Sequence, residues 1–158
     1  MANTQSMTTS FMAEVLTATH NFGTAPIRAA STADTFKAAL YLASATVNAS
    51  TTAYSATNEV TGTNYTAGGV AVTNATPPTS TNASATAGVA YWTPSASITY
   101  TNVTLSTAFD AVLIYNNTQS NKAVSVHTFG SQTVTAGTFT LTMPSNTTTA
   151  ALLRLATT

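Results

Sequence analysis

The chain has 158 residues, of which 44% are hydrophobic and only 5% are charged, and its formal net charge is zero. This composition excludes an intrinsically disordered chain, which combines low hydrophobicity with high charge. The length suits one domain with one hydrophobic core. The four Lys and Arg residues are scattered along the sequence, so we expect no basic surface that follows a phosphate backbone and no nucleic-acid partner.

Cysteine does not occur in the sequence, so hydrophobic packing has to hold the fold without disulfides or thiolate metal ligands. The first nine residues lack the basic start and apolar run of a signal peptide, and no window is long and apolar enough for a membrane span. We therefore expect a protein made in a soluble compartment, with no membrane partner. A net charge near zero gives little electrostatic help for solubility, which favours a protein that works within an assembly.

The N-terminal residues have the spacing of a short helix. From Ser6 to His20 the apolar residues recur every three or four positions, which places them on one side of a helix. These residues are Met7, Phe11, Met12, Val15 and Leu16. Ser6 or Thr8 is a candidate cap, and the residues 21–23 supply a stop signal. Such a helix either lies across the sheet or docks on a neighbouring subunit, and the pattern favours neither.

An alternating pattern at 35–42 predicts the first core strand. The loop 74–88 is expected to be exposed, because its prolines and small polar residues form neither a ladder nor a core. The chain returns to the fold at 89–92. The single tryptophan, Trp92, is expected to be a packing anchor, with a contact to a partner as the alternative.

Between these strands, the stretch 58–73 gathers residues that are rare elsewhere in the chain. It contains Glu59, Tyr65 and three of the seven glycines, and it leads into the apolar alternation at 70–72. Glycines at this spacing predict tight turns on either side of a tyrosine anchor. The alternative is a phosphate-binding loop, which needs a following helix and a Gly-Lys-Ser/Thr ending that are not found here. A structural turn is therefore favoured.

The second half of the chain predicts further strands. The segment 97–105 shifts its apolar phase by one residue near Asn102, which indicates a β-bulge. The run 109–115 is apolar without clean alternation, which predicts a central strand covered on both faces. Further strands are predicted at 122–129, 132–135, 138–143 and 151–155, with Gly130 as a turn.

Short strands separated by Gly, Pro and Asn predict a mainly β fold, an antiparallel β-sandwich or a jelly-roll-like arrangement, with one short N-terminal helix. We divide the chain into an N-terminal arm and helix, 1–33, and a β-sandwich domain, 34–158.

Side chains able to support catalysis are few and dispersed. His20 is expected at the end of the helix, and His127 alternates with Ser125 on one side of a strand, with no nucleophile-elbow pattern beside either histidine. The carboxylates lie far apart in the sequence, and Asp110 is expected to bond to backbone amides or to a nearby Lys or Arg. No spacing typical of a metal site occurs. We therefore expect no enzyme, no cofactor and no metal site.

Several sequence blocks occur in a characteristic order. They are Ala39-Leu-Tyr-Leu42, Glu59-x-x-Gly62-x-x-Tyr65-x-x-Gly68-Gly69 before a Val-rich strand, Tyr91-Trp92 before a Thr-rich strand, and Phe109-Asp-Ala-Val-Leu-Ile-Tyr115 followed by a Thr-Phe-Thr-Leu-Thr ending. Together they resemble a family of small virion proteins of tailed bacteriophages, described variously as decoration, cement or tail-fibre proteins. The resemblance covers most of the chain from Asp34 onward, and the N-terminal helical segment departs from it. It implies a β-sandwich or jelly-roll-like module that contacts other virion subunits.

The resemblance implies a location in the virion, with the capsid surface favoured over the tail, after synthesis in the bacterial host cytoplasm. Our first hypothesis is a capsid decoration (cement) protein that bridges major capsid subunits, with further copies of itself, as a dimer or trimer, as partners. Met7, Phe11 and Met12 are its candidate subunit-docking residues. The alternative is a tail-fibre or receptor- and glycan-binding module, in which Trp92 and the Tyr residues stack on sugar rings.

Overall fold

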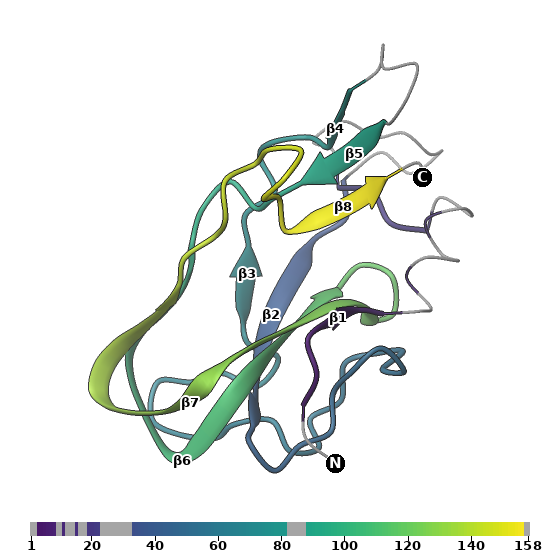
Figure 1. Ribbon diagram of the computed structural model, residues 1–158. Coiled ribbons are helices and arrows are strands. Elements are labelled where there is room, and N and C mark those ends of the chain that lie inside the picture. The colour runs from purple at the N-terminus through teal and green to yellow at the C-terminus, as the bar shows by residue number, and fades with distance from the viewer. Residues whose placement is uncertain are drawn as a thin grey trace.

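The computed structural model describes residues 3–8, 11, 15, 19–22, 33–81 and 88–156. The described part is mainly β and contains two antiparallel sheets (Figure 1). The strands are β1 Ser6–Met7, β2 Phe36–Leu42, β3 Val70–Val72, β4 Thr79–Ser80, β5 Val89–Trp92, β6 Ile98–Asn116, β7 Lys122–Leu141 and β8 Leu153–Ala156. The large sheet has the order β1-β7-β6-β2-β3 and the small sheet the order β4-β5-β8. The predicted mainly β, antiparallel fold is confirmed, whereas the jelly-roll detail and the division after residue 33 stay predictions.

Strands β6 and β7 form one long hairpin that dominates the large sheet (Figure 1). The two strands predicted at 97–105 and 109–115 are a single strand, and Gly130, predicted as a turn, lies inside β7. These predictions of breaks were wrong. Each long strand supplies the ladder partners of the other over most of its length, so a local signal for a break is overridden by cross-strand pairing.

The hairpin bends instead of breaking, as Figure 1 shows near the middle of both strands. The β6–β7 register shifts between Tyr100 and Val103, and Asn102 between them has a left-handed φ of 52°. On β7, Ala136 has a φ of 46° and lies next to Gly137, the partner of Val103. A bulge leaves an extra residue unpaired and increases local twist and bending. The bulge predicted near Asn102 is confirmed.

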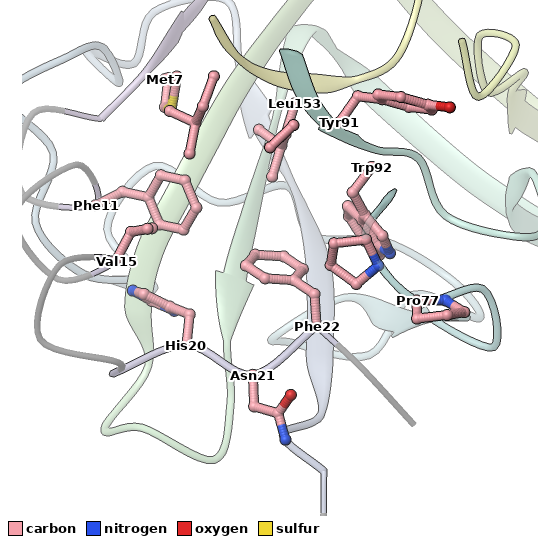
Figure 2. A pocket seen from close by; sticks show the side chains of 13 residues that line it. Met7, Phe11, Val15, His20, Asn21, Phe22, Pro77, Tyr91, Trp92 and Leu153 are labelled. Atoms are coloured by element: carbon pink, nitrogen blue, oxygen red, sulfur yellow. The ribbon is translucent and has the colours of Figure 1, made fainter. Parts of the chain in front are cut away.

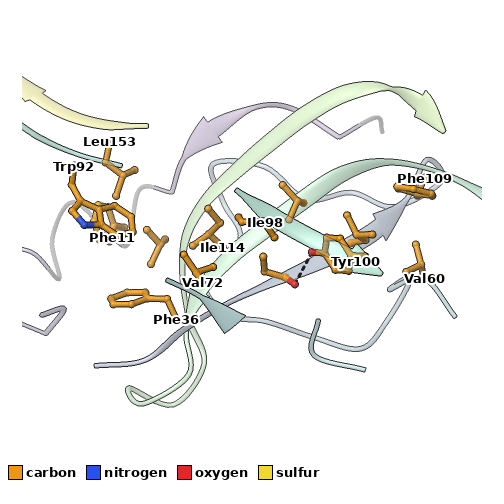
Figure 3. Close-up of a cluster of buried hydrophobic side chains, with 14 of the residues drawn as sticks. Phe11, Phe36, Val60, Val72, Trp92, Ile98, Tyr100, Phe109, Ile114 and Leu153 are labelled. Carbon is orange, nitrogen blue, oxygen red and sulfur yellow. Dashed lines mark hydrogen bonds between the residues drawn. The ribbon is translucent and has the colours of Figure 1, made fainter. Parts of the chain in front are cut away.

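The run 109–115 of β6 is covered on both faces, as predicted. Its side chains alternate between two apolar clusters. The larger cluster lies between the two sheets and contains Phe36, Trp92, Ile114 and Leu153 (Figure 3). The smaller cluster lies on the opposite face of the large sheet.

The long connection after β2 covers that opposite face. Ala45 and Val47 are buried there against the large sheet. The ring of Tyr54 stacks on the ring of Tyr115, with 4.7 Å between centroids. A loop of mainly small and polar residues therefore closes the core with a few well-placed apolar side chains.

The first residues of the predicted helix form a strand. Ser6 pairs with Val126, and Met7 pairs with Ser125, so β1 covers the outer edge of β7. The amide of Thr8 continues the pairing by donating to the Val124 carbonyl at 3.1 Å. The helix prediction was wrong for these residues because they satisfy an otherwise open sheet edge. Phe11 and Val15 are helical, and 12–14 and 16–18, including Met12, lie outside the described residues.

Asn3 holds the N-terminal residues on the large sheet and is the hydrogen-bond partner of the Asp110 carboxylate. Its side-chain amide donates to the Leu42 carbonyl at 3.2 Å and to the carboxylate of Asp110, and its Oδ1 accepts from the Val47 amide at 3.0 Å. Asp110 was expected to bond to backbone amides or to a Lys or Arg, so the structure corrects the partner. Asp110 lies where the β6–β7 register shifts between Phe109 and Ala111.

The segment predicted as an exposed loop, 74–88, contains the short strand β4. Thr79 pairs with Tyr91, and Ser80 pairs with Ala90. The expectation that no ladder forms there was wrong because the two prolines precede the paired residues and leave their amides free to pair. Residues 82–87 lie outside the described residues.

Candidate functional site

An apolar recess lies between the small sheet and the N-terminal segment, and we treat it as the candidate site (Figure 2). Its volume is about 340 Å³. One wall is the inner face of the small sheet, where Ala90 pairs with Leu155 and Trp92 pairs with Leu153. Because strand side chains alternate between faces, these four residues point to the same side of the sheet.

The opposite wall comes from the N-terminal segment. It consists of Met7 on β1, the helical residues Phe11 and Val15, and the buried Phe22 (Figure 2). Phe22 connects the two walls, since its ring stacks on Phe36 of β2 at 4.4 Å and lies 4.7 Å from the ring of Trp92. The floor of the recess is therefore continuous with the main core.

Trp92 is a packing anchor, as predicted. Its side chain is 3% exposed, and its indole Nε1 donates to the Thr76 carbonyl at 2.9 Å. A buried indole whose N–H is satisfied contributes a large apolar area without a desolvation penalty. Trp92 thus fixes the small sheet on the large one and forms the back of the recess.

The structure places the three predicted docking residues differently from one another. Phe11 is 2% exposed and belongs to the main core cluster. Met7 is half-buried, packs against the same cluster and lines the recess. Met12 lies outside the described residues. The docking role of these residues stays a prediction. Because Phe11 is buried, it can contribute to docking only by forming part of the recess wall.

His20 stands at the polar end of the recess. Its ring packs edge-on against Phe11 at 4.9 Å, and its Nδ1 lies 3.0 Å from the side-chain nitrogen of Asn116. The orientation of Asn116 is fixed because its Oδ1 accepts from the amides of Thr118 and Gln119, both at 3.1 Å. Asn116 therefore donates, and Nδ1 of His20 accepts, which requires an unprotonated Nδ1.

Asp34 accepts hydrogen bonds from the same group of residues around Asn116. This carboxylate is 3% exposed and accepts from the Asn21 amide at 2.9 Å, from Asn116 at 2.8 Å and from Gln119 at 3.0 Å. A buried carboxylate needs such donors to offset its lost hydration. Asp34 thereby holds the end of the N-terminal segment on the β6–β7 turn.

Glu59 is a second buried carboxylate, and its partners come from the glycine- and tyrosine-containing stretch. It is 6% exposed. One oxygen accepts from the Tyr65 hydroxyl at 2.7 Å and the Gly68 amide at 2.8 Å, and the other accepts from the Tyr54 hydroxyl at 2.7 Å. Gly68 and Gly69 have left-handed φ values of 88° and 71°. The turns predicted there are confirmed, and they fold around an acidic acceptor.

The phenols around Glu59 are held in their neutral form. Burial, together with the charge of Glu59, raises the pKa of Tyr41 and of Tyr115 to about 12. Burial and the hydrogen bond to Glu59 also raise the pKa values of Tyr54 and Tyr65. Neutral phenols donate to a carboxylate, so this cluster is internally satisfied.

His127 and Ser125 share one face of β7, as the alternation predicted, and they are hydrogen-bonded with 2.9 Å between Oγ and Nε2. Ser125 is 1% exposed. A buried hydroxyl is poorly placed to attack a substrate, and the carboxylates of Asp34, Glu59 and Asp110 are engaged in the hydrogen bonds described above. The pair is best explained as part of the packing.

Burial lowers the pKa of His127 to about 4. Between pH 6.5 and 4 the unfolded chain binds a proton at this histidine while the folded chain does not, so the free energy of unfolding should fall as the pH drops. The expected slope from this residue is about 1.4 kcal/mol per pH unit. Urea unfolding at pH 7, 6, 5 and 4 measures it. In the variant His127→Gln this contribution should vanish, and equal slopes in both proteins would contradict the assignment.

Comparisons of the chain with protein-family models, with curated proteins and with solved structures found no match. Among the described residues, no group of three or more His, Cys, Asp or Glu side chains is placed to hold a metal ion. No helix in the described part of the chain is long and apolar enough to cross a membrane. Fold and site together define a mainly β protein whose carboxylates Asp34, Glu59 and Asp110 are bonded within the chain, with an apolar recess between the small sheet and the N-terminal segment.

Proposed function

We propose that the chain is a bacteriophage virion structural protein, a capsid decoration (cement) protein that binds the outside of the head and bridges major capsid subunits. The observation that carries the proposal is that three carboxylates are hydrogen-bonded within the chain, while the recess is apolar and open. The carboxylates of Asp34, Glu59 and Asp110 are hydrogen-bonded within the chain, whereas the recess presents apolar side chains to its opening. Such a distribution suits contact with another protein better than chemistry on a polar substrate.

The low charge of the chain supports the same function. With 5% charged residues and no net charge, the surface gains little solubility from electrostatic repulsion. Association with partners removes part of this surface from water. On a shell, one modest contact is repeated by symmetry, so many copies together stabilise neighbouring subunits. We propose that the partners include further copies of the chain itself, as a dimer or trimer. We also propose that the two sheets form a jelly-roll-like arrangement.

The glycan-binding alternative has less support. It depends on an exposed cluster of Trp92 and tyrosine rings, and Trp92 is 3% exposed, while Tyr41, Tyr100 and Tyr115 are each 2% exposed. The indole N–H of Trp92 is also used by the Thr76 carbonyl. We therefore retain the capsid surface, and not the tail, as the proposed location.

Electron microscopy of purified particles labelled with an antibody against this chain tests the proposal. Label distributed over the head is expected, together with peptides of the chain in a digest of the same particles. Label confined to the tail would favour the tail-fibre alternative. Particles with neither label nor peptides would refute a structural role in the virion.

A further inference from the structure

Among the described residues, no formally charged side chain lines the apolar recess. Its walls combine aliphatic and aromatic side chains with the prolines of the 74–88 segment. The most polar part is the end formed by His20 and Asn21, where the imidazole Nδ1 and the backbone N–H of Asn21 already have partners. An occupant with a charged group would lose its hydration here without gaining a counter-ion. Charge complementarity therefore demands an uncharged, apolar occupant.

The rim of the recess is as apolar as its walls. Leu155, at 43% exposure, is the one large hydrophobic side chain that is classed as exposed in the described part of the chain. It lines the recess together with Pro77 and Pro78, which are also exposed, and with the exposed Ala90. Exposed apolar side chains that gather around a hollow mark a contact with a partner.

The size of the recess limits what enters it. Ligand pockets span roughly 300–1,000 Å³, and this recess, at about 340 Å³, lies at the small end of that range. It has room for one large side chain and not for a helix or a strand. In protein interfaces a single aromatic or aliphatic anchor in a desolvated pocket often carries most of the binding energy.

We propose that the recess is a socket for one uncharged, apolar side chain, aromatic or branched aliphatic, that projects from a loop of the capsid subunit. This inference rests on the proposed function and specifies its contact. Trp92 and Leu153 form the back of the socket, Met7 and Phe22 its opposite wall, and Leu155 closes over the inserted side chain. The N-terminal segment then contributes to docking as a wall of the socket and not as a free arm.

The test uses a substitution whose larger side chain fills the socket. In the variant Ala90→Phe the added ring occupies the recess, while the backbone stays a strand and the position is exposed, so the fold should persist. The matched control is Ala71→Phe, which adds the same ring at an exposed position of β3 that does not line the recess. Purified protein is mixed with particles from which this chain has been removed, and bound protein is measured by co-sedimentation over a range of concentrations.

We expect wild type and Ala71→Phe to bind alike and Ala90→Phe to bind at least about 30-fold more weakly, the loss of one hot-spot contact. Equal urea unfolding midpoints for the two variants establish that the fold is intact. If Ala90→Phe unfolds more easily, Leu155→Ser replaces it, since that change removes only an exposed rim contact. Wild-type binding with no loss in the recess variant overturns the socket but leaves the decoration function standing. No binding by wild type overturns both.

Discussion

The substitution Gly69→Ala is expected to destabilise the native fold severely. Gly69 has a φ of 71°, a left-handed conformation that costs an L-residue roughly 1–2 kcal/mol. A Cβ at this position would also overlap the Ala38 carbonyl oxygen and lie 2.8 Å from the Ala39 Cα. These are backbone atoms of β2, so no side chain can rotate away to relieve the overlap. We expect a loss of at least about 4 kcal/mol in the free energy of unfolding, measured by urea denaturation.

Gly130→Ala is the matched control for this prediction. Gly130 lies within β7, and a Cβ there would have no heavy atom within 4 Å. The stability should change by no more than about 0.5 kcal/mol, because surface substitutions away from special backbone positions have small effects. Similar unfolding midpoints for the two variants would show that the close approach of Gly69 to β2 is not what fixes the turn.

The sequence predicted those elements whose pattern is local. Alternation at 35–42 gave β2 within one residue, and the apolar run 109–115 was correctly placed in the centre with both faces covered. The phase change near Asn102 located a bulge, since one extra residue reverses the facing of every later side chain. The turns predicted in 58–73 are confirmed at Gly68 and Gly69, whose left-handed φ values glycine adopts without strain.

The errors come from pairing between distant segments. Ser6 and Met7 fit both a helix and a strand, and the open edge of β7, which is more than a hundred residues away in the sequence, decides for the strand. Gly130 is a typical turn residue, but β7 continues through it, and it lies where the β6–β7 register shifts between Phe109 and Ala111. Phe11 and Val15, which belong to the same predicted helix, are helical.

The recess was foreseen only in fragments. Met7 and Phe11 were singled out as docking residues and Trp92 as a packing anchor. Their contact with Leu153 and Leu155 depends on the small sheet, which the local pattern did not predict. The role of Glu59 was missed as well. A carboxylate among tyrosines and glycines was a usable signal, since phenols and turn amides are the donors that a buried acid needs.

The substitution Glu59→Ala is expected to destabilise the fold by about 3–5 kcal/mol. It removes the acceptor for the Tyr65 hydroxyl and for the buried Gly68 amide, and each buried donor left without a partner costs about 1–3 kcal/mol. It also leaves a cavity beneath the turn, which adds to the loss. Urea denaturation followed by circular dichroism measures the effect.

Glu59→Gln separates the acceptor geometry from the charge. The glutamine carbonyl oxygen can still accept from Tyr65 and Gly68, and its amide can donate to the Tyr54 hydroxyl, which rotates to accept. The loss should then be about 1 kcal/mol, the difference between hydrogen bonds to charged and to neutral acceptors. If Gln proved as damaging as Ala, the negative charge and not the set of hydrogen bonds would hold the turn. If neither change mattered, Glu59 would not organise this stretch, and the close packing of Gly69 on β2 alone would have to explain it.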